Sequence, residues 1–475
     1  MQKPLWIAPL LMTALVACTG AEKKDPGALV DEGPLLLDPA VEPEPNPMET
    51  LPVASAVLLR GATVMTANGV THTPGWVRLR DGKIHSLGAG AGPEVEANER
   101  VVEAQGKFVT PGLIDTHSHL GVYASPGVWA HSDGNEMTSP ITSGVRAEDA
   151  VWPQDPGIER AVKGGVTTMQ VLPGSGNLMG GRGVILKLHP FREARAMRFP
   201  GAKDTLKMAC GENPKRVYGR DKGSMPMSRM GSIYLMRQKW ADARRYKLKW
   251  DQWRKKPYEL KEGKKVPINP PERDLTLETM AGVLAGDILA QIHCYRADEM
   301  LMQLRLAREF GWKVRSFHHA VEAYKIRDVL AAEGVSVSTW ADWWGFKIEA
   351  WDAVEQNLAL LQEAGARAIV HTDSPEGIQR MNQEAAKGLA AGREAGIGLT
   401  EDQALRWITA NPAWALGIDE KVGTLEVGKH ADVVVWDAHP FSVYTHAEKV
   451  FVDGHLRFDR QAPPRKPWSD FEVTK

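Results

Sequence analysis

The sequence predicts an α/β protein: a (β/α)8 TIM-type barrel with a small composite β-sandwich domain formed by both ends of the chain. Three observations predict it. Short apolar runs alternate with helical stretches through the middle of the chain. Strand-like runs separated by glycine turns occur at both ends. Several of the central runs finish in histidine or aspartate, and polar residues gather at the carboxyl ends of the strands in barrels of this kind.

Eight apolar runs supply the candidate barrel strands. They are 112–117, 166–172, 184–188, 205–210, 288–293, 313–318, 335–339 and 368–373. Helical stretches alternate with them, at 298–310, 322–333, 352–364 and 379–394. This alternation is typical of parallel strands joined by helices. An open doubly wound sheet is the alternative, but Gly174-Ser175-Gly176 and Gly180–Gly183 lack the spacing of the phosphate-binding fingerprint that such sheets often carry.

The two ends of the chain are expected to form one β domain, from residues 54–110 and 421–475, around a barrel at 111–420. Runs such as Val57–Arg60 and Val433–Trp436 are rich in β-branched and apolar residues. Turn pairs such as Asp81-Gly82 separate them.

The overall charge of the chain is close to neutral. The chain has 475 residues, of which 25% are charged, and its formal net charge is −1. This balance gives no reason to expect nucleic acid as a partner. A basic stretch at 236–256 carries aromatic residues at helical spacing. We expect it to be an insertion that packs on the barrel, although nucleic-acid stacking or a membrane surface would also suit it.

The first residues are expected to direct export. Residues 1–18 hold a lysine and an apolar run too short to span a bilayer, which is typical of a signal peptide. Leu15-Val16-Ala17-Cys18 resembles the lipobox of bacterial lipoproteins, which implies lipidation of Cys18. Because Thr19 stands where an inner-membrane retention aspartate would be, the expected location is the cell envelope, at the periplasmic face of the outer membrane. A simple secretory signal is the alternative.

A tether is expected to follow. Residues 19–53 are rich in proline, glutamate, aspartate and glycine, so they bury too little apolar surface to fold. Beyond them the chain has two cysteines, Cys210 and Cys294. A disulfide between them would suit an oxidising compartment, but we expect both to be unpaired.

The run 108–119 carries the strongest chemical signal. It is an apolar strand that passes a Pro111-Gly112 corner and ends in His117 and His119. Side chains two residues apart leave a strand on the same face, so this pair suits joint binding of one ion. Two hydrogen-bonded core histidines are the structural alternative.

Other runs end in the same kinds of residue. His293 ends the fifth run, His318 and His319 end the sixth, and Asp373 ends the eighth. Imidazoles with one carboxylate suit Zn²⁺ or a similar ion. Adjacent strand residues face opposite sides, so only one of His318 and His319 is expected to reach it.

Residues near these strand ends are further candidates. His371 shares the face of Asp373 and would orient a bound water or contact substrate, unless it is a packed core histidine. Trp340, Trp343 and Trp344 follow the seventh run, where they would either line a substrate pocket or pack in the ordinary way.

These motifs resemble the metal-dependent amidohydrolase superfamily, in particular its imidazolonepropionase-like branch. The matching residues are Val109–His119, Gly164–Thr168, His371 and Asp373 in the barrel, with Asp81–Ile84 and Gly428–Val434 at the ends. The resemblance covers about residues 54–460.

The resemblance implies a ligand set. His117, His119, His293 and His319 would bind the metal, with His319 preferred over His318 because of the family-like run 319–325. Asp373 would be both a ligand and the proton shuttle. Lys207, in carbamylated form, and Glu212 are candidates for a group that bridges two metals, so the resemblance implies one or two divalent ions, with zinc expected.

The expected function follows from this set. The chain would be a metal-dependent hydrolase that cleaves a non-peptide C–N bond of a small amide or cyclic amide, with Asp373 and His371 as catalytic residues. One alternative is a metallo-dipeptidase of the Xaa-Pro or Xaa-Arg type. Another is a catalytically inactive, lipid-anchored binding protein. Contact with membrane is expected through the lipid anchor only, and the oligomeric state is left open.

Overall fold

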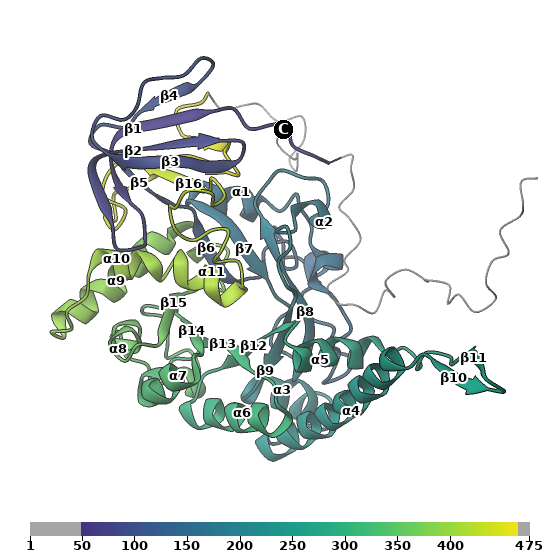
Figure 1. Ribbon diagram of the computed structural model, residues 1–475. Helices are drawn as coiled ribbons and strands as arrows, with labels where there is room; N and C mark the ends of the chain where they lie inside the picture. Colours follow the sequence, from purple (N-terminus) through teal and green to yellow (C-terminus); the bar gives the residue numbers. More distant parts are fainter. Residues whose placement is uncertain (1–48, 464–475) are drawn as a thin grey trace, which may run out of the picture.

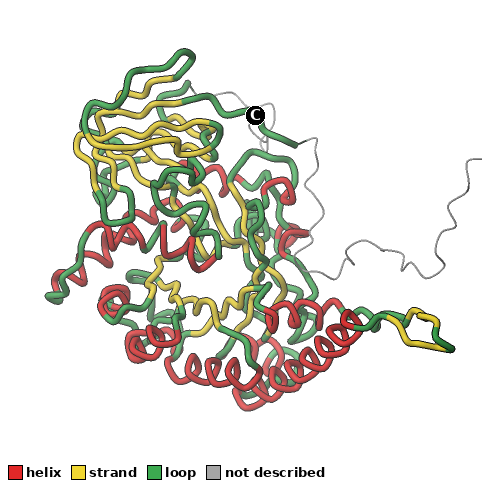
Figure 2. The backbone as a smooth tube through the Cα atoms, in the orientation of Figure 1, coloured by secondary structure: helices red, strands yellow, loops and turns green. Residues whose placement is uncertain are grey.

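The computed structural model describes residues 49–463 (Figure 1). The expected signal peptide, the lipidation of Cys18 and nearly all of the tether lie outside the described residues. Helices surround much of the barrel sheet, whereas the part built from the two chain ends consists mainly of strands and loops (Figure 2).

Eight strands form the barrel sheet, in the order β15-β14-β13-β12-β9-β8-β7-β6. Their bounds are β6 Leu113–Ser118, β7 Val166–Val171, β8 Met179–Lys187, β9 Thr205–Ala209, β12 Leu289–Cys294, β13 Val314–His319, β14 Ser336–Thr339 and β15 Arg367–Val370. Each overlaps one of the eight predicted runs. Continuous burial along β6, β7 and β9 explains why these strands read as apolar runs without alternation.

The third strand corrects the expectation of a wholly parallel barrel. β8 is antiparallel to both β7 and β9. Residues 172–178, which join β7 to β8, contain no helix. Parallel pairing needs a crossover of a dozen or more residues, so this short connection turns the chain straight back.

The ends of the sheet meet at the carboxyl ends of β6 and β15. The amide of Asp373 donates to the carbonyl oxygen of His117 at 3.0 Å. The amide of Thr372 donates to the Asp115 carboxylate at 3.3 Å. These bonds bring the first and last barrel strands together where the predicted site residues lie.

Helices lie in the connections after β6, after β8 and after each later barrel strand. They are α1 Pro156–Lys163, α2 Ala194–Met197, α3 Glu212–Lys215, α5 Leu275–Ala285, α6 Ala297–Phe310, α7 Arg327–Glu333, α8 Asn357–Glu363, α9 Met381–Glu394, α10 Glu401–Arg406 and α11 Ala410–Leu416. Local sequence sets their ends. In α5, the Asp274 side chain accepts from the amides of Thr276 and Leu277, and Gly286 takes the left-handed conformation after the last turn.

The basic aromatic insertion forms the long helix α4, Arg229–Lys255. Trp240 is buried and stacks on Trp312 with ring centroids 4.8 Å apart, so the helix packs as expected from its aromatic spacing. Beyond α4 the hairpin β10 (Tyr258–Lys261) and β11 (Lys264–Pro267) projects from the body of the molecule (Figure 1). Within residues 49–463, no helix combines the length and apolar character that crossing a bilayer requires.

Strands from both chain ends form a second sheet, ordered β18-β17-β16-β5-β1-β2-β3 with β4 paired to β1. Their bounds are β1 Val57–Met65, β2 Thr71–Arg80, β3 Lys83–Ala89, β4 Arg100–Glu103, β5 Phe108–Pro111, β16 Val433–Trp436, β17 Ala447–Val452 and β18 His455–Asp459. β5 and β16 join the two ends as antiparallel neighbours, with Val109 opposite Val435. Residues from both ends share one buried apolar cluster.

A disulfide links Cys210 and Cys294, with Cα atoms 5.3 Å apart. The expectation of two unpaired cysteines was wrong. β9 and β12 are parallel neighbours, with Ala209 opposite His293. The residues that follow these two, Cys210 and Cys294, therefore lie opposite each other. That adjacency depends on strand order, which the spacing of cysteines in a sequence does not reveal.

Candidate metal and catalytic site

Three imidazoles surround the carboxylate of Asp373. Its Oδ1 lies 3.2 Å from His119 Nε2 and 3.7 Å from His117 Nε2. Its Oδ2 lies 3.9 Å from His319 Nδ1. The structure therefore brings together residues from β6, from β13 and from the segment after β15. Such spacing suits a set of ligands around one cation better than a set of direct ion pairs.

His293 joins this group from β12. Its ring centroid is 4.5 Å from that of His319, and the residue is 2% exposed. Neither ring nitrogen has a hydrogen-bond partner among the described residues. A buried polar group without a partner costs free energy, so these nitrogens are available to a bound ion or water.

The charge state of the histidines fits a divalent metal. Burial lowers the pKa of His117, His293 and His319 well below the ordinary value, and neighbouring positive charges act in the same direction. Neutral imidazole is the form that binds metal. The donor set of buried neutral imidazoles and one carboxylate therefore fits the zinc-type ion expected from the sequence.

His318 lies beside the site, but both of its ring nitrogens contact protein groups, so His319 remains the proposed ligand of the pair. The ring centroids of both lie 4.8 Å from that of His117. His319 has a φ of 69°, which breaks the alternation of a regular strand at its last residue. His318 Nδ1 lies 2.9 Å from His117 Nδ1, and its Nε2 lies 2.8 Å from Gln291 Oε1. Sequence reasoning missed His318 as a support for His117.

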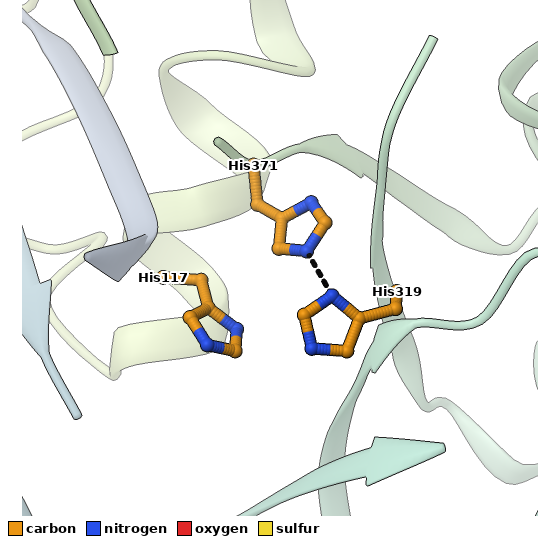
Figure 3. A group of neighbouring side chains, drawn as sticks. All are labelled: His117, His319 and His371. Carbon is orange, nitrogen blue, oxygen red and sulfur yellow. Dashed lines mark hydrogen bonds between the residues drawn. The ribbon is translucent and has the colours of Figure 1, made fainter. Parts of the chain in front are cut away.

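His371 lies against His319 rather than beside Asp373 on a strand. β15 ends at Val370, and Asp373 has a φ of 52°, so the two residues belong to an irregular segment. His371 Nε2 is 2.9 Å from His319 Nδ1, as the dashed line in Figure 3 shows. Burial lowers the pKa of His371 to about 4, and its Nδ1 has no partner among the described residues.

The two candidate bridging residues lie in different surroundings. Lys207 is buried on β9, with Nζ 3.1 Å from His117 Nε2 and 3.0 Å from the carbonyl oxygen of Pro173. Burial lowers the pKa of Lys207 to about 7. Glu212 begins α3 and lies 3.5 Å from Lys347 Nζ. Of these two candidates, the structure places Lys207 beside the imidazoles.

Asp115 holds the backbone of the site in place through hydrogen bonds. It is fully buried, and burial raises its pKa to about 7. Its carboxylate accepts from the His117 amide at 3.0 Å and from the amide and hydroxyl of Thr372. One side chain thus fixes the backbone next to His117 and next to Asp373.

Burial raises the pKa of Asp373, but a hydrogen bond with His119 and the charge of that ring outweigh this, so the pKa is lowered overall. The side chain of Asp373 is 24% exposed, whereas that of His117 is 1% exposed. The carboxylate therefore lies on the open side of the cluster, where it stays ionised and accessible.

Known proteins with similar sequences and structures agree with this site. A model of the amidohydrolase family matches residues 275–475. The chain is 32% identical over 388 residues to the amidohydrolase tasK of Hapsidospora irregularis, covering 79% of this chain but only 39% of that protein's length. It is 26% identical over 394 residues to an imidazolonepropionase of Mesorhizobium japonicum, covering 76% of this chain and 86% of the relative.

A solved structure extends the likeness over most of the chain. An amidohydrolase from Thermotoga maritima MSB8 matches with a TM-score of 0.76 and 35% identity, covering 85% of this chain and 100% of that one. The sequence motifs, the barrel and these comparisons lead to the same conclusion: the chain belongs to the amidohydrolase family of hydrolases.

Proposed function

We propose that this amidohydrolase adds water to the carbonyl carbon of a small amide or cyclic amide and breaks its non-peptide C–N bond. The observation that carries the proposal is the convergence of His117, His119, His293 and His319 around the partly exposed carboxylate of Asp373. A relative named imidazolonepropionase supports a cyclic amide as the substrate class.

The residues that would hold a divalent metal, proposed to be zinc, are these four histidines and Asp373. When bound, such an ion lowers the pKa of water and polarises a substrate carbonyl. Lys207, carbamylated at Nζ by carbon dioxide so that it offers two carboxylate oxygens, is the proposed bridging residue if two ions are present, because Nζ lies 3.1 Å from His117 Nε2.

Asp373 is the proposed proton carrier. Its carboxylate accepts a proton at an oxygen atom as water attacks, and then gives that proton to the leaving nitrogen. His119 Nε2 lies 3.2 Å from Oδ1 of this carboxylate, and its proximity helps to hold the pKa of Asp373 below the ordinary value. His371 holds the His319 ring through Nε2 and keeps Nδ1 available to a water or to substrate.

The test is Asp373→Asn in zinc-loaded protein, assayed on a lactam, a hydantoin, an imidazolone and Xaa-Pro and Xaa-Arg dipeptides. We expect kcat/KM for a cyclic amide to fall by about 10²–10⁴-fold, the usual contribution of a proton-transferring side chain. Glu355→Gln, which changes an exposed carboxylate outside the cluster, is the control. Zinc content measured on the same samples separates lost proton transfer from lost metal.

Two outcomes would contradict the proposal. Wild-type turnover in the Asp373→Asn protein would remove the assigned role of this carboxylate. Hydrolysis of the dipeptides with none of the cyclic amides would favour the metallo-dipeptidase alternative.

The disulfide supports the location expected from residues 1–18. Disulfides persist in oxidising compartments such as the bacterial envelope and are rare in the cytosol. The Cys210–Cys294 bond therefore agrees with an enzyme that works outside the cytoplasm.

A further inference from the structure

An aromatic wall begins directly at the proposed metal-binding histidines. Trp340, the first residue after β14, is 7% exposed and stacks on His319 with ring centroids 4.6 Å apart. It also lies 4.9 Å from the His371 ring, and its indole nitrogen donates to the carbonyl oxygen of Thr372 at 3.0 Å. This indole is therefore fixed against the reaction centre.

The wall continues from Trp340 toward solvent. Trp343 lies 4.8 Å from Trp340, and Phe346 lies 5.3 Å from Trp343 and 5.9 Å from Trp340, measured between ring centroids. Trp343 is 46% exposed and Phe346 is 48% exposed. We name Trp340, Trp343 and Phe346 the aromatic wall. Its inner end touches His319, and its outer end presents apolar ring surface to solvent.

The charged side chain next to the aromatic wall, Lys347, already interacts with neighbouring protein groups. Lys347 Nζ lies 4.1 Å from the Tyr295 ring centroid, 3.5 Å from Glu212 and 3.8 Å from Glu349. Its charge is balanced by these two carboxylates, so it is not a free cation for an acidic substrate group. The exposed ring surface of Trp343 and Phe346 is what remains for a ligand at this side of the mouth.

We propose that the aromatic wall is a specificity subsite that stacks an aromatic substituent carried next to the scissile C–N bond. The inference rests on the proposed amide hydrolysis, because the wall begins at His319, within reach of a substituent on a carbonyl held at the histidine cluster. Stacked and edge-to-face ring pairs form at centroid separations of about 4.5–7 Å and add to the free energy of apolar burial. Pockets for small ligands commonly combine such apolar lining with a few polar groups.

The test is equilibrium binding of matched hydroxamates to the zinc-loaded protein, measured by titration calorimetry. Acetohydroxamate carries no ring, and two benzyl derivatives place a ring on the acyl side or on the nitrogen side. We expect at least one benzyl compound to bind about 10-fold more tightly than acetohydroxamate, the size of effect that one ring pair and its burial supply. Trp343→Ala should remove most of this preference, whereas Trp343→Phe should retain most of it.

Trp351→Ala is the matched control, because Trp351 belongs to the same connection after β14, is 66% exposed and is not part of the wall. It should leave the preference unchanged. The proposal is overturned if neither benzyl compound binds more tightly than acetohydroxamate, or if the preference survives in both Trp343→Ala and Phe346→Ala. If the preference behaves as expected but no amide is hydrolysed, the subsite stands and the proposed hydrolase function falls.

Discussion

Three of the four proposed histidine ligands have a ring nitrogen fixed by a neighbour. His119 Nδ1 lies 2.8 Å from the carbonyl oxygen of Leu172, His117 Nδ1 lies 2.9 Å from His318, and His319 Nδ1 lies 2.9 Å from His371. In metal sites, the second nitrogen of a ligating histidine usually makes such a bond, which fixes the tautomer and ring orientation. Nε2 of His117 and Nε2 of His119 then face the Asp373 carboxylate, where the ion would bind.

His318→Asn tests this support. We expect zinc affinity to fall by about 10–100-fold, as is typical when a partner of a ligating histidine is lost. Competition with a chromophoric chelator measures the affinity. His446→Asn is the control. The His446 side chain is 52% exposed, and the residue lies between β16 and β17 of the second sheet, which the two chain ends form and which we call the end sheet. Equal zinc affinity in the His318 variant and the wild type would show that His318 is only a packing residue.

Lys207 and Glu212 make opposite predictions for metal content. Because Lys207 lies beside His117 and Glu212 lies beside Lys347, Lys207→Ala should lower the number of zinc ions per chain and Glu212→Gln should not. Elemental analysis of the purified proteins measures both. A loss of zinc confined to the Glu212 variant would show that Glu212, rather than Lys207, is the bridging residue.

At the scale of elements, the sequence predicted which segments become strands, and the structure corrected how some of them run. Apolar runs mark buried strands because burial on both faces leaves little choice of residue. The antiparallel direction of β8 was missed because it depends on the length of one connection and on the pairing of β8 with β9. The contact of His318 with His117 was missed because a positive φ at His319 ends the alternation that the sequence argument assumed.

The disulfide between β9 and β12 should stabilise the barrel at its catalytic end. Cys210 and Cys294 are separated by 84 residues, and closing a loop of that size typically contributes about 2–4 kcal/mol. We expect the double variant Cys210→Ser, Cys294→Ser to lose about this much in the free energy of unfolding, measured in urea. A reductant should destabilise the wild type and leave the variant unchanged. A variant as stable as the oxidised wild type would contradict the prediction.

At the scale of the whole molecule, a buried ionic network joins the barrel to the end sheet. Lys187, at the end of β8, lies 2.9 Å from Asp432 and also contacts Asp453. Asp453 is 2.9 Å from His189 and 2.8 Å from His430. Charged groups that are far apart in the sequence therefore form one ionic network where the barrel meets the end sheet. Sequence patterns predicted that the two chain ends form one domain. They did not predict which charged residues pair, because that depends on how the two sheets pack together.

The network predicts how stability depends on pH. Burial raises the pKa of Asp453, but hydrogen bonds from His189, His430 and Lys187 outweigh it and hold the pKa well below its ordinary value. A carboxyl whose pKa is lowered by folding stabilises the protein above its unfolded pKa of about 3.9 and loses that contribution as the pH falls below it. We expect the free energy of unfolding to decrease with falling pH in this acidic range.

Asp453→Asn isolates this contribution. We expect it to cost about 3 kcal/mol at neutral pH, because it leaves Lys187 without one buried partner, and to flatten the acid limb of the stability curve. Urea unfolding at a series of pH values provides the measurement. An acid limb as steep in the variant as in the wild type would assign the pH dependence to other carboxyl groups.

The most direct test of the central claim is a zinc titration of the metal-free protein beside its His117→Ala, His119→Ala variant, with far-ultraviolet circular dichroism to confirm folding. The account predicts tight binding of at least one zinc ion per wild-type chain and none in the folded variant, since His117 and His119 are two of the proposed ligands. A wild-type protein that takes up no zinc, or a variant that binds it equally well, would contradict a shared metal centre at the mouth of this barrel.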